Sequence, residues 1–204
     1  MALRTLVLAV LVLAATAGCE PRTTGTAAPT VSAGSTHAAD LLARRDIPGA
    51  GWRPVSVPAE HELGWSFAVS GCPGYVAADY PAQRHRVAAR AAAFTQGHGR
   101  EVRLILEVYA DSWAEQALAD VRRGIAVCPR YDDGTVLASH TVEAEGFAGD
   151  DSLMVRSDHV QGTESARQWW TAVVRRGATV ATVTGTQLTE TEVRRIAAAQ
   201  VDRL

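Results

Sequence analysis

The chain has 204 residues, of which 47% are hydrophobic and 21% charged, a composition typical of a globular protein. Its formal net charge of −2 gives no electrostatic basis for binding nucleic acid. All 20 basic residues are Arg, and the absence of Lys and Asn excludes Schiff-base chemistry, P-loop nucleotide binding and N-glycosylation.

The first 18 residues indicate an export signal. A basic residue, Arg4, precedes an apolar run at 6–15, which is short for a bilayer span. Small residues then precede Cys19, a pattern that resembles the cleavage site of bacterial lipoprotein precursors. The resemblance implies cleavage before Cys19 and attachment of lipid to its thiol and amine. The alternative is an ordinary secretory signal that leaves Cys19 as a free thiol.

A tether and a folded domain are expected after the signal. Residues 20–35 are rich in Thr, Ala, Gly, Ser and Pro without apolar periodicity, which is typical of a flexible segment. With the lipidated Cys19 as its first residue, the tether spans 19–35 and a single domain occupies 36–204. Because two or more acyl chains hold a protein firmly on a membrane, we expect the domain on the extracytoplasmic face of the cell membrane.

In the first half of the domain, one stretch is ambiguous. A helix is expected from Thr36 to just before Ile47, and a strand at 65–69. The Ala content of 84–94 favours helix, but a turn and a clearly alternating strand at 102–109 follow it. We therefore interpret this stretch as the first strand of a hairpin.

The next helix connects to the remaining cysteines. Ser112 and Glu115 form a capping box, and an apolar residue at every fourth position leads to Cys128. Export removes the reducing cytosol, so Cys72 and Cys128 are expected to form a disulfide. The alternative, a redox-active pair, lacks the CxxC spacing usual for such pairs. A structural disulfide is the favoured interpretation.

The second half predicts four more strands and a final helix. The strands are expected at 135–143, 153–156, 168–175 and 178–184. The last two form a hairpin through Arg176 and Gly177, and Thr189 and Glu192 form a second capping box. The whole pattern indicates an α+β fold, a mostly antiparallel sheet flanked by about three helices and held by one disulfide.

Catalytic and metal-binding motifs are absent from the sequence. The six His residues include no pair with ligand spacing on one element; His140 and His159 lie in separate segments and are expected at the surface. No G-x-S-x-G or G-x-G-x-x-G occurs, and Asp132 with Asp133 is typical of a turn. We therefore expect no cofactor, no metal and no catalytic residue.

Two adjacent tryptophans are the candidates for ligand contact. Trp169 and Trp170 point to opposite faces of their strand, so one ring faces outward or into a groove. An aromatic-lined pocket is a common form of binding site.

The order of these features resembles a known family. IPGAGW at 47–52, GDDS at 149–152 and VVRRG at 173–177 occur with the two helices and the Cys pair in the order of the PknH-type extracellular sensor domain of actinobacteria. The resemblance covers 36–204. It implies an antiparallel sheet flanked by helices, with a cleft for an unknown extracellular ligand. In that family the domain occurs on receptor Ser/Thr kinases, with two disulfides, and on free-standing lipoproteins; here only Cys72–Cys128 is possible.

These observations predict a membrane-anchored lipoprotein with a non-catalytic ligand-binding domain. The expected partners are the membrane, through the N-terminal lipid, an unidentified small-molecule, glycan or lipid ligand, and an envelope protein. The alternatives are a cell-envelope hydrolase with an unrecognised site and a scaffold subunit of an envelope complex.

Overall fold

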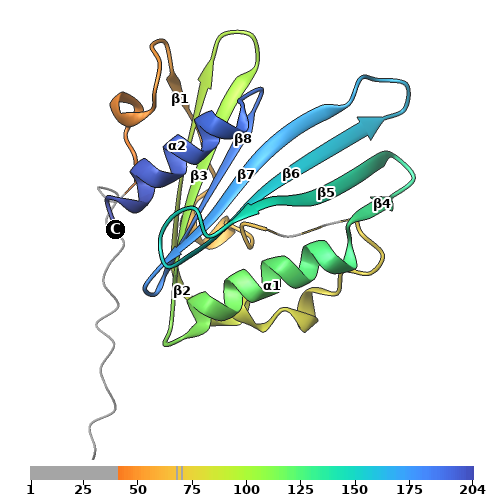
Figure 1. Cartoon of the computed structure of the whole chain (residues 1–204), viewed down its shortest axis with the longest axis horizontal. Helices are drawn as coiled ribbons and strands as arrows, with labels where there is room; N and C mark the ends of the chain where they lie inside the picture. Colours follow the sequence, from red (N-terminus) through yellow and green to blue (C-terminus); the bar gives the residue numbers. More distant parts are fainter. Residues whose placement is uncertain (1–40, 68, 70) are drawn as a thin grey trace, which may run out of the picture. The chain divides into compact units, whose positions relative to one another are not determined.

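The structure, a computed structural model, describes residues 41–67, 69 and 71–204. Within that part the chain forms one eight-stranded sheet and two α-helices (Figure 1). The strand order is β1-β2-β3-β8-β7-β6-β5-β4, and every neighbouring pair is antiparallel. The expected α+β class is confirmed. The export signal, Cys19, the tether and the first residues of the expected domain lie outside the described residues.

The two edge strands are three residues long, and the six strands between them are 8 to 11 residues long. They are β1 (Arg53–Val55), β2 (Arg86–Gln96), β3 (Arg100–Tyr109), β4 (Arg130–Asp132), β5 (Val136–Glu145), β6 (Asp151–Gln161), β7 (Arg167–Arg176) and β8 (Thr179–Thr186). The helices are α1 (Trp113–Val127) and α2 (Glu190–Val201). Short 3₁₀ turns occur at Arg44–Asp46, Glu60–Glu62, Ala77–Asp79 and Pro81–His85.

The two α-helices cover opposite faces of the sheet (Figure 1). On β3, Leu104 and Leu106 pack into the apolar cluster that contains α2, whereas Tyr109 packs into the cluster that contains α1. Successive side chains of a strand point to opposite faces. A sheet that is covered on both sides therefore needs apolar residues at odd and at even positions of its strands. We call these the α1 face and the α2 face.

Most elements agree with the sequence-based expectations. The ambiguous stretch is strand β2, paired with β3 as a hairpin. The hairpin through Arg176 and Gly177 joins β7 to β8. At α2 the Thr189 hydroxyl accepts the Glu192 N–H while the Glu192 carboxylate accepts the Thr189 N–H, which is the predicted capping box.

Three expectations were wrong in detail. Residues 65–67 are not a strand but an irregular segment with a turn, and the Ser66 N–H donates to the Glu107 carboxylate instead of to a neighbouring strand. The Ser112 side chain makes no cap at α1; its carbonyl oxygen accepts the Glu115 N–H in a tight first turn. Of the early helix expected from Thr36, the structure describes residues 41–46. They form no α-helix but contain the 3₁₀ turn Arg44–Asp46.

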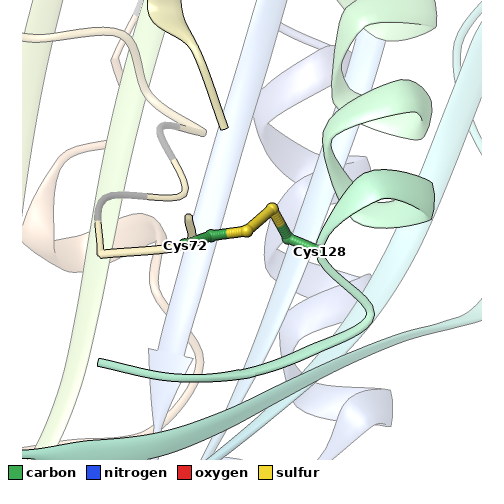
Figure 2. The surroundings of a disulfide bond; sticks show 2 residues. All are labelled: Cys72 and Cys128. Atoms are coloured by element: carbon green, nitrogen blue, oxygen red, sulfur yellow. A yellow bond between two sulfur atoms is a disulfide. The ribbon is translucent and has the colours of Figure 1, made fainter. Parts of the chain in front are cut away.

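The predicted disulfide is confirmed. Cys72 bonds to Cys128 with their Cα atoms 6.2 Å apart, and it joins the irregular connection before β2 to the C-terminal end of α1 (Figure 2). Both cysteines are buried. The bond therefore fixes the connecting segment against the α1 side of the molecule.

No helix in the described ranges is long and apolar enough to cross a membrane.

Candidate functional site

Along its strands, the α1 face of the sheet changes from apolar to polar side chains. On β6, Leu153 and Val155 pack into the apolar cluster under α1, but Ser157 and His159, the next two residues on that face, are polar. On β5, His140 pairs directly with Ser157. Beyond the end of α1, the same face therefore carries hydroxyl and imidazole groups.

A cavity of about 200 Å³ lies over this polar region, which we call the central pocket. Its described lining residues come from the irregular segment before Cys72 and from β4 to β8: Ser66, Phe67, Val69, Tyr131, His140, Ser157, His159, Thr171 and Thr184. None of these side chains carries a permanent charge. The pocket thus combines aromatic surface with a set of hydroxyl groups.

His140 is the most constrained polar group of the central pocket. Its Nδ1 lies 2.8 Å from the Ser157 Oγ. Its Nε2 is buried and has no hydrogen-bond partner among the described residues. The centroids of the Phe67, Tyr131 and His159 rings lie 6.5, 5.9 and 5.9 Å from the centroid of the His140 ring. Because an unpaired buried nitrogen costs free energy, Nε2 is a position that a ligand atom would complete.

Both imidazoles of the pocket are neutral at pH 7. Burial lowers the pKa of His140 below its usual value of 6.5, and the neighbouring His159 lowers it further. Burial also lowers the pKa of His159, although the carboxylates of Asp133 and Asp158 act in the opposite direction. A neutral imidazole offers one donor and one acceptor, so each ring can exchange hydrogen bonds with a hydroxyl group.

The turn between β4 and β5 holds Asp133 near this pocket. Its Oδ1 accepts the N–H groups of Thr135 and Val136 at 2.8 and 2.7 Å, and these bonds lower the pKa of Asp133. Asp132 accepts the Gly134 N–H at 2.8 Å. The adjacent aspartates therefore stabilise a turn, as predicted.

A polar network fixes the wall formed by Ser66. The Thr182 hydroxyl donates to the Ser66 Oγ at 3.0 Å, and Ser66 donates to Glu107 at 2.6 Å. Glu107 is fully buried and accepts further bonds from Arg86 at 2.7 Å and from the Tyr109 hydroxyl at 3.2 Å. Burial, together with the Glu107 charge, raises the pKa of Tyr109, which stays a neutral donor.

Two further cavities adjoin the central pocket. One, of about 260 Å³, shares Ser66 and Thr184 with it and extends to Trp65, Arg103 and other residues beside β3. The other, of about 90 Å³, shares His159 and extends to Trp169. The larger of the two follows the central pocket across the strands on the α1 face, and the smaller lies next to it toward the turn between β6 and β7. We call this row of three cavities the groove.

The disulfide supports the walls of the central pocket. Cys72 and Cys128 pack with Val69, and Phe67 and Tyr131 pack against the same small cluster. Phe67 precedes Cys72 in the irregular segment, whereas Tyr131 follows Cys128 in β4. One covalent bond thus holds two opposing aromatic walls in place.

The two candidate tryptophans lie on opposite faces. Trp170 packs against the apolar cluster on the α2 face. Trp169 lies on the α1 face, where its ring meets His159 edge to face at a centroid distance of 4.3 Å. Only Trp169 therefore belongs to the groove, at its end.

Sequence reasoning did not find the two histidines. His140 was expected at the surface and apart from His159, but β5 pairs with β6 and brings the rings together. The available signal was the polar pair Ser157 and His159, two positions apart, directly after the apolar pair on the same strand face. In the described part of the chain, no group of three or more His, Cys, Asp or Glu side chains has a metal-binding arrangement.

A larger open cavity, of about 530 Å³, lies beside the first described residues. It is lined by residues 43–45 and 49–52. Its indole, Trp52, already donates to the Pro48 carbonyl at 3.0 Å. None of the described residues that line this open cavity has an unsatisfied buried polar group. The groove, which contains His140, is therefore the stronger candidate site.

A solved structure resembles this arrangement of strands and helices. The extracellular domain of PknH from Mycobacterium tuberculosis matches with a TM-score of 0.52 at 15% identity, over 81% of this chain and 92% of that one. The chain has the fold of the PknH extracellular domain. An Rv0999 ortholog from Mycobacterium smegmatis matches with a TM-score of 0.39 at 13% identity, over 60% of this chain and 70% of that one. No protein-family model and no curated protein matches the sequence.

The likeness to PknH confirms the fold that the sequence resemblance implied. At this identity it concerns the course of the chain, not the side chains of the groove.

Proposed function

We propose that this protein is an extracytoplasmic, lipid-anchored lipoprotein whose described domain is a non-catalytic binding domain, and that the groove holds its ligand. The observation that carries the proposal is the central pocket, an uncharged cavity lined by aromatic rings, hydroxyl groups and His140, whose buried Nε2 has no partner among the described residues. A ligand donor or acceptor placed there would remove the cost of that unpaired atom. The similar solved domain of PknH is extracellular, and the buried disulfide agrees with an oxidising compartment.

One contact favours a hydrolase, the leading alternative. Ser157 and His140 are hydrogen-bonded, as in a catalytic dyad. In serine hydrolases, however, a carboxylate orients the His from the nitrogen opposite the nucleophile. Here the opposite nitrogen has no partner in the described ranges, and Ser157 is buried. Binding is therefore favoured over catalysis.

The binding test is thermal unfolding of the mature chain with four probes: a neutral oligosaccharide, an anionic oligosaccharide, a peptidoglycan fragment and palmitate. A compound that binds only the native state raises the unfolding midpoint. We expect at least one probe to raise it in the native protein and not in His140→Phe. His98→Phe, at an exposed turn position, is the matched control. No shift with any probe would contradict the proposal.

The catalytic alternative has its own measurement. Ester and glycan substrates are incubated with the native protein and with Ser157→Ala. We expect no turnover by either protein. Turnover that Ser157→Ala abolishes would establish a hydrolase and overturn the proposed function.

Lipid anchoring is tested separately by membrane fractionation. We expect the native precursor in the membrane fraction and Cys19→Ala in the soluble fraction, because the lipid is attached at that thiol. Cys72→Ala serves as the control, since it removes a thiol without touching the lipid attachment site. A Cys19→Ala protein that stays with the membrane would contradict the anchor.

A further inference from the structure

We propose that the groove binds an uncharged, hydroxyl-rich oligosaccharide that lies across the strands of the sheet. This inference rests on the proposed function and adds the chemical class of the ligand. Three observations carry it: the chemistry of the pocket lining, the absence of permanent charge there, and the length of the groove.

The lining presents groups that both donate and accept hydrogen bonds. Ser157, Thr171 and Thr184 supply hydroxyls from three adjacent strands, and the neutral His140 supplies a buried, unpaired Nε2. A sugar hydroxyl also donates and accepts, so it can complete such a set in either direction. Ser157 is already bonded to His140 Nδ1 and Thr171 to Thr184 at 3.2 Å, but each hydroxyl can make further bonds, whereas an acyl chain would use none of this capacity and would leave the His140 Nε2 unpaired.

The charge of the central pocket disfavours ionic ligands. No described lining residue carries a permanent charge, so a phosphate or carboxylate would enter without a cation to receive it. The carboxylates of Asp133 and Asp158 act on His159 and disfavour an anion beside it. A cationic ligand finds no carboxylate in the lining. The adjoining cavities each carry both signs of charge, Glu62 with Arg103 in one and Glu164 with Arg167 in the other, so an uncharged ligand is favoured over an ion of either sign.

Aromatic rings provide the apolar part of the site. Phe67 and Tyr131 line the central pocket, and Trp169 lines the small cavity at the end of the groove. The carbon-bound hydrogens of a sugar ring form apolar faces that pack against such rings. Aromatic surface beside hydroxyl groups thus fits both sides of a sugar.

The length of the groove indicates a chain rather than a single small molecule. The central pocket and the larger adjoining cavity run from β3 across β8, β7, β6 and β5 to β4. At about 4.8 Å between neighbouring strands, the strands that line these two cavities span roughly 24 Å. An extended peptide is the competing occupant, but peptides that add to sheets pair with a free edge strand. This groove lies on a face, where side chains and not backbone groups are available.

The test is isothermal titration of the mature chain with tetrasaccharides of glucose and of N-acetylglucosamine. The comparison probes are the corresponding monosaccharides, an anionic tetrauronate, palmitate and an uncharged tetrapeptide. We expect a neutral tetrasaccharide to bind, and its monosaccharide to bind at least about tenfold more weakly because it fills one cavity of the row.

Variants assign the binding to the groove. His140→Phe and Thr184→Val are each expected to weaken tetrasaccharide binding about tenfold, the equivalent of one lost hydrogen bond. Their controls, His98→Phe and Thr163→Val, lie at exposed turn positions and should bind like the native protein. The unfolding midpoint of each variant is measured alongside, so that Thr184→Val still decides the matter where His140→Phe unfolds.

The outcomes separate this inference from the proposed function. If palmitate, the tetrauronate or the peptide binds and His140→Phe abolishes it, the groove is a binding site but the ligand class is wrong. If a tetrasaccharide binds equally to the native protein and both groove variants, the assigned site is wrong. If no probe of any class binds, both the inference and the proposed function are overturned.

Discussion

The Ser66 hydroxyl donates a hydrogen bond of 2.6 Å to the buried carboxylate of Glu107. This bond connects a wall of the groove to a charge inside the molecule. Arg86 supplies the opposite charge, with its Nη1 atom 2.7 Å from the Glu107 Oε1. The side chains of Arg86 and Glu107 are 16% and 1% exposed, so solvent cannot replace the arginine. The position of the groove wall therefore depends on an ion pair beneath it.

Removal of the cation should destabilise the protein strongly. Arg86→Met leaves the Glu107 carboxylate buried without its partner, and we expect the free energy of unfolding to fall by about 3–5 kcal/mol. Urea unfolding followed by Trp fluorescence measures this change. The control is Arg90→Met, whose ion pair with Glu60 is partly exposed and should contribute less than about 1 kcal/mol. Equal effects of the two substitutions would contradict this account.

The disulfide should contribute stability through the unfolded chain. Cys72 and Cys128 are separated by 56 residues, and cross-linking a loop of that length is worth about 4 kcal/mol in the chain-entropy model. We expect Cys72→Ala/Cys128→Ala to lose about that much in urea unfolding. Full reduction of the native protein should give a similar loss and leave the double variant unchanged. A reduced native protein as stable as the oxidised one would contradict the prediction.

Two backbone segments approach each other closely at Gly149, and no side chain fits between them. Its φ is +62°, and a Cβ built there lies 2.3 Å from the Arg175 carbonyl oxygen and 2.8 Å from a methyl group of Val174. Gly146 has nearly the same φ, +63°, but a Cβ there meets no described atom within 4 Å. The two glycines therefore share the backbone strain and differ only in space.

This pair of glycines separates the steric cost from the conformational cost. Both alanine variants place a side chain in the left-handed region, which costs roughly 1–2 kcal/mol. Gly149→Ala must also displace strand β7, and we expect it to lose about 1–3 kcal/mol more than Gly146→Ala in urea unfolding. Equal losses would indicate that the chain between Gly146 and Gly149 shifts freely.

Local signals explain which elements the sequence predicted well. The alternation along β3, the capping box at Thr189 and the turn at Asp133 each arise from neighbouring residues, so they are readable without the fold. The disulfide followed from the count of cysteines and the export signal. The segment at 65–69 misled because Trp65 and Val69 are buried by packing over the sheet, not by pairing within it.

The groove could not be predicted from such local signals in the sequence. The residues of its central pocket come from five strands and one irregular segment, and their meeting depends on the strand order and register. His140 reaches His159 only because β5 and β6 pair with Ser157 opposite His140. A shift of β5 by one residue in that register would turn His140 to the other face, away from His159. Sequence reasoning placed Trp169 and Trp170 on opposite faces but had no means of choosing between them.

The histidines of the groove should make the stability of the protein depend on pH, at pH values above those at which Asp and Glu carboxyl groups titrate. The pKa of His140 and that of His159 lie below the usual 6.5, mainly because of burial. As the pH falls below 6.5, the unfolded chain takes up these protons before the folded chain does. Stability therefore falls with falling pH in this window, and the loss is complete below the folded pKa values.

The slope of stability against pH measures this effect. The free energy of unfolding in urea is determined from about pH 7.5 to about pH 5, where Asp and Glu carboxylates remain largely ionised. The lowered pKa values of Asp133, Asp151 and Glu192 act at lower pH still. His140→Phe should flatten the slope because it removes one of the two groups, whereas His98→Phe should keep the native slope. A native slope in His140→Phe would mean that His140 is no harder to protonate in the folded chain than in the unfolded one.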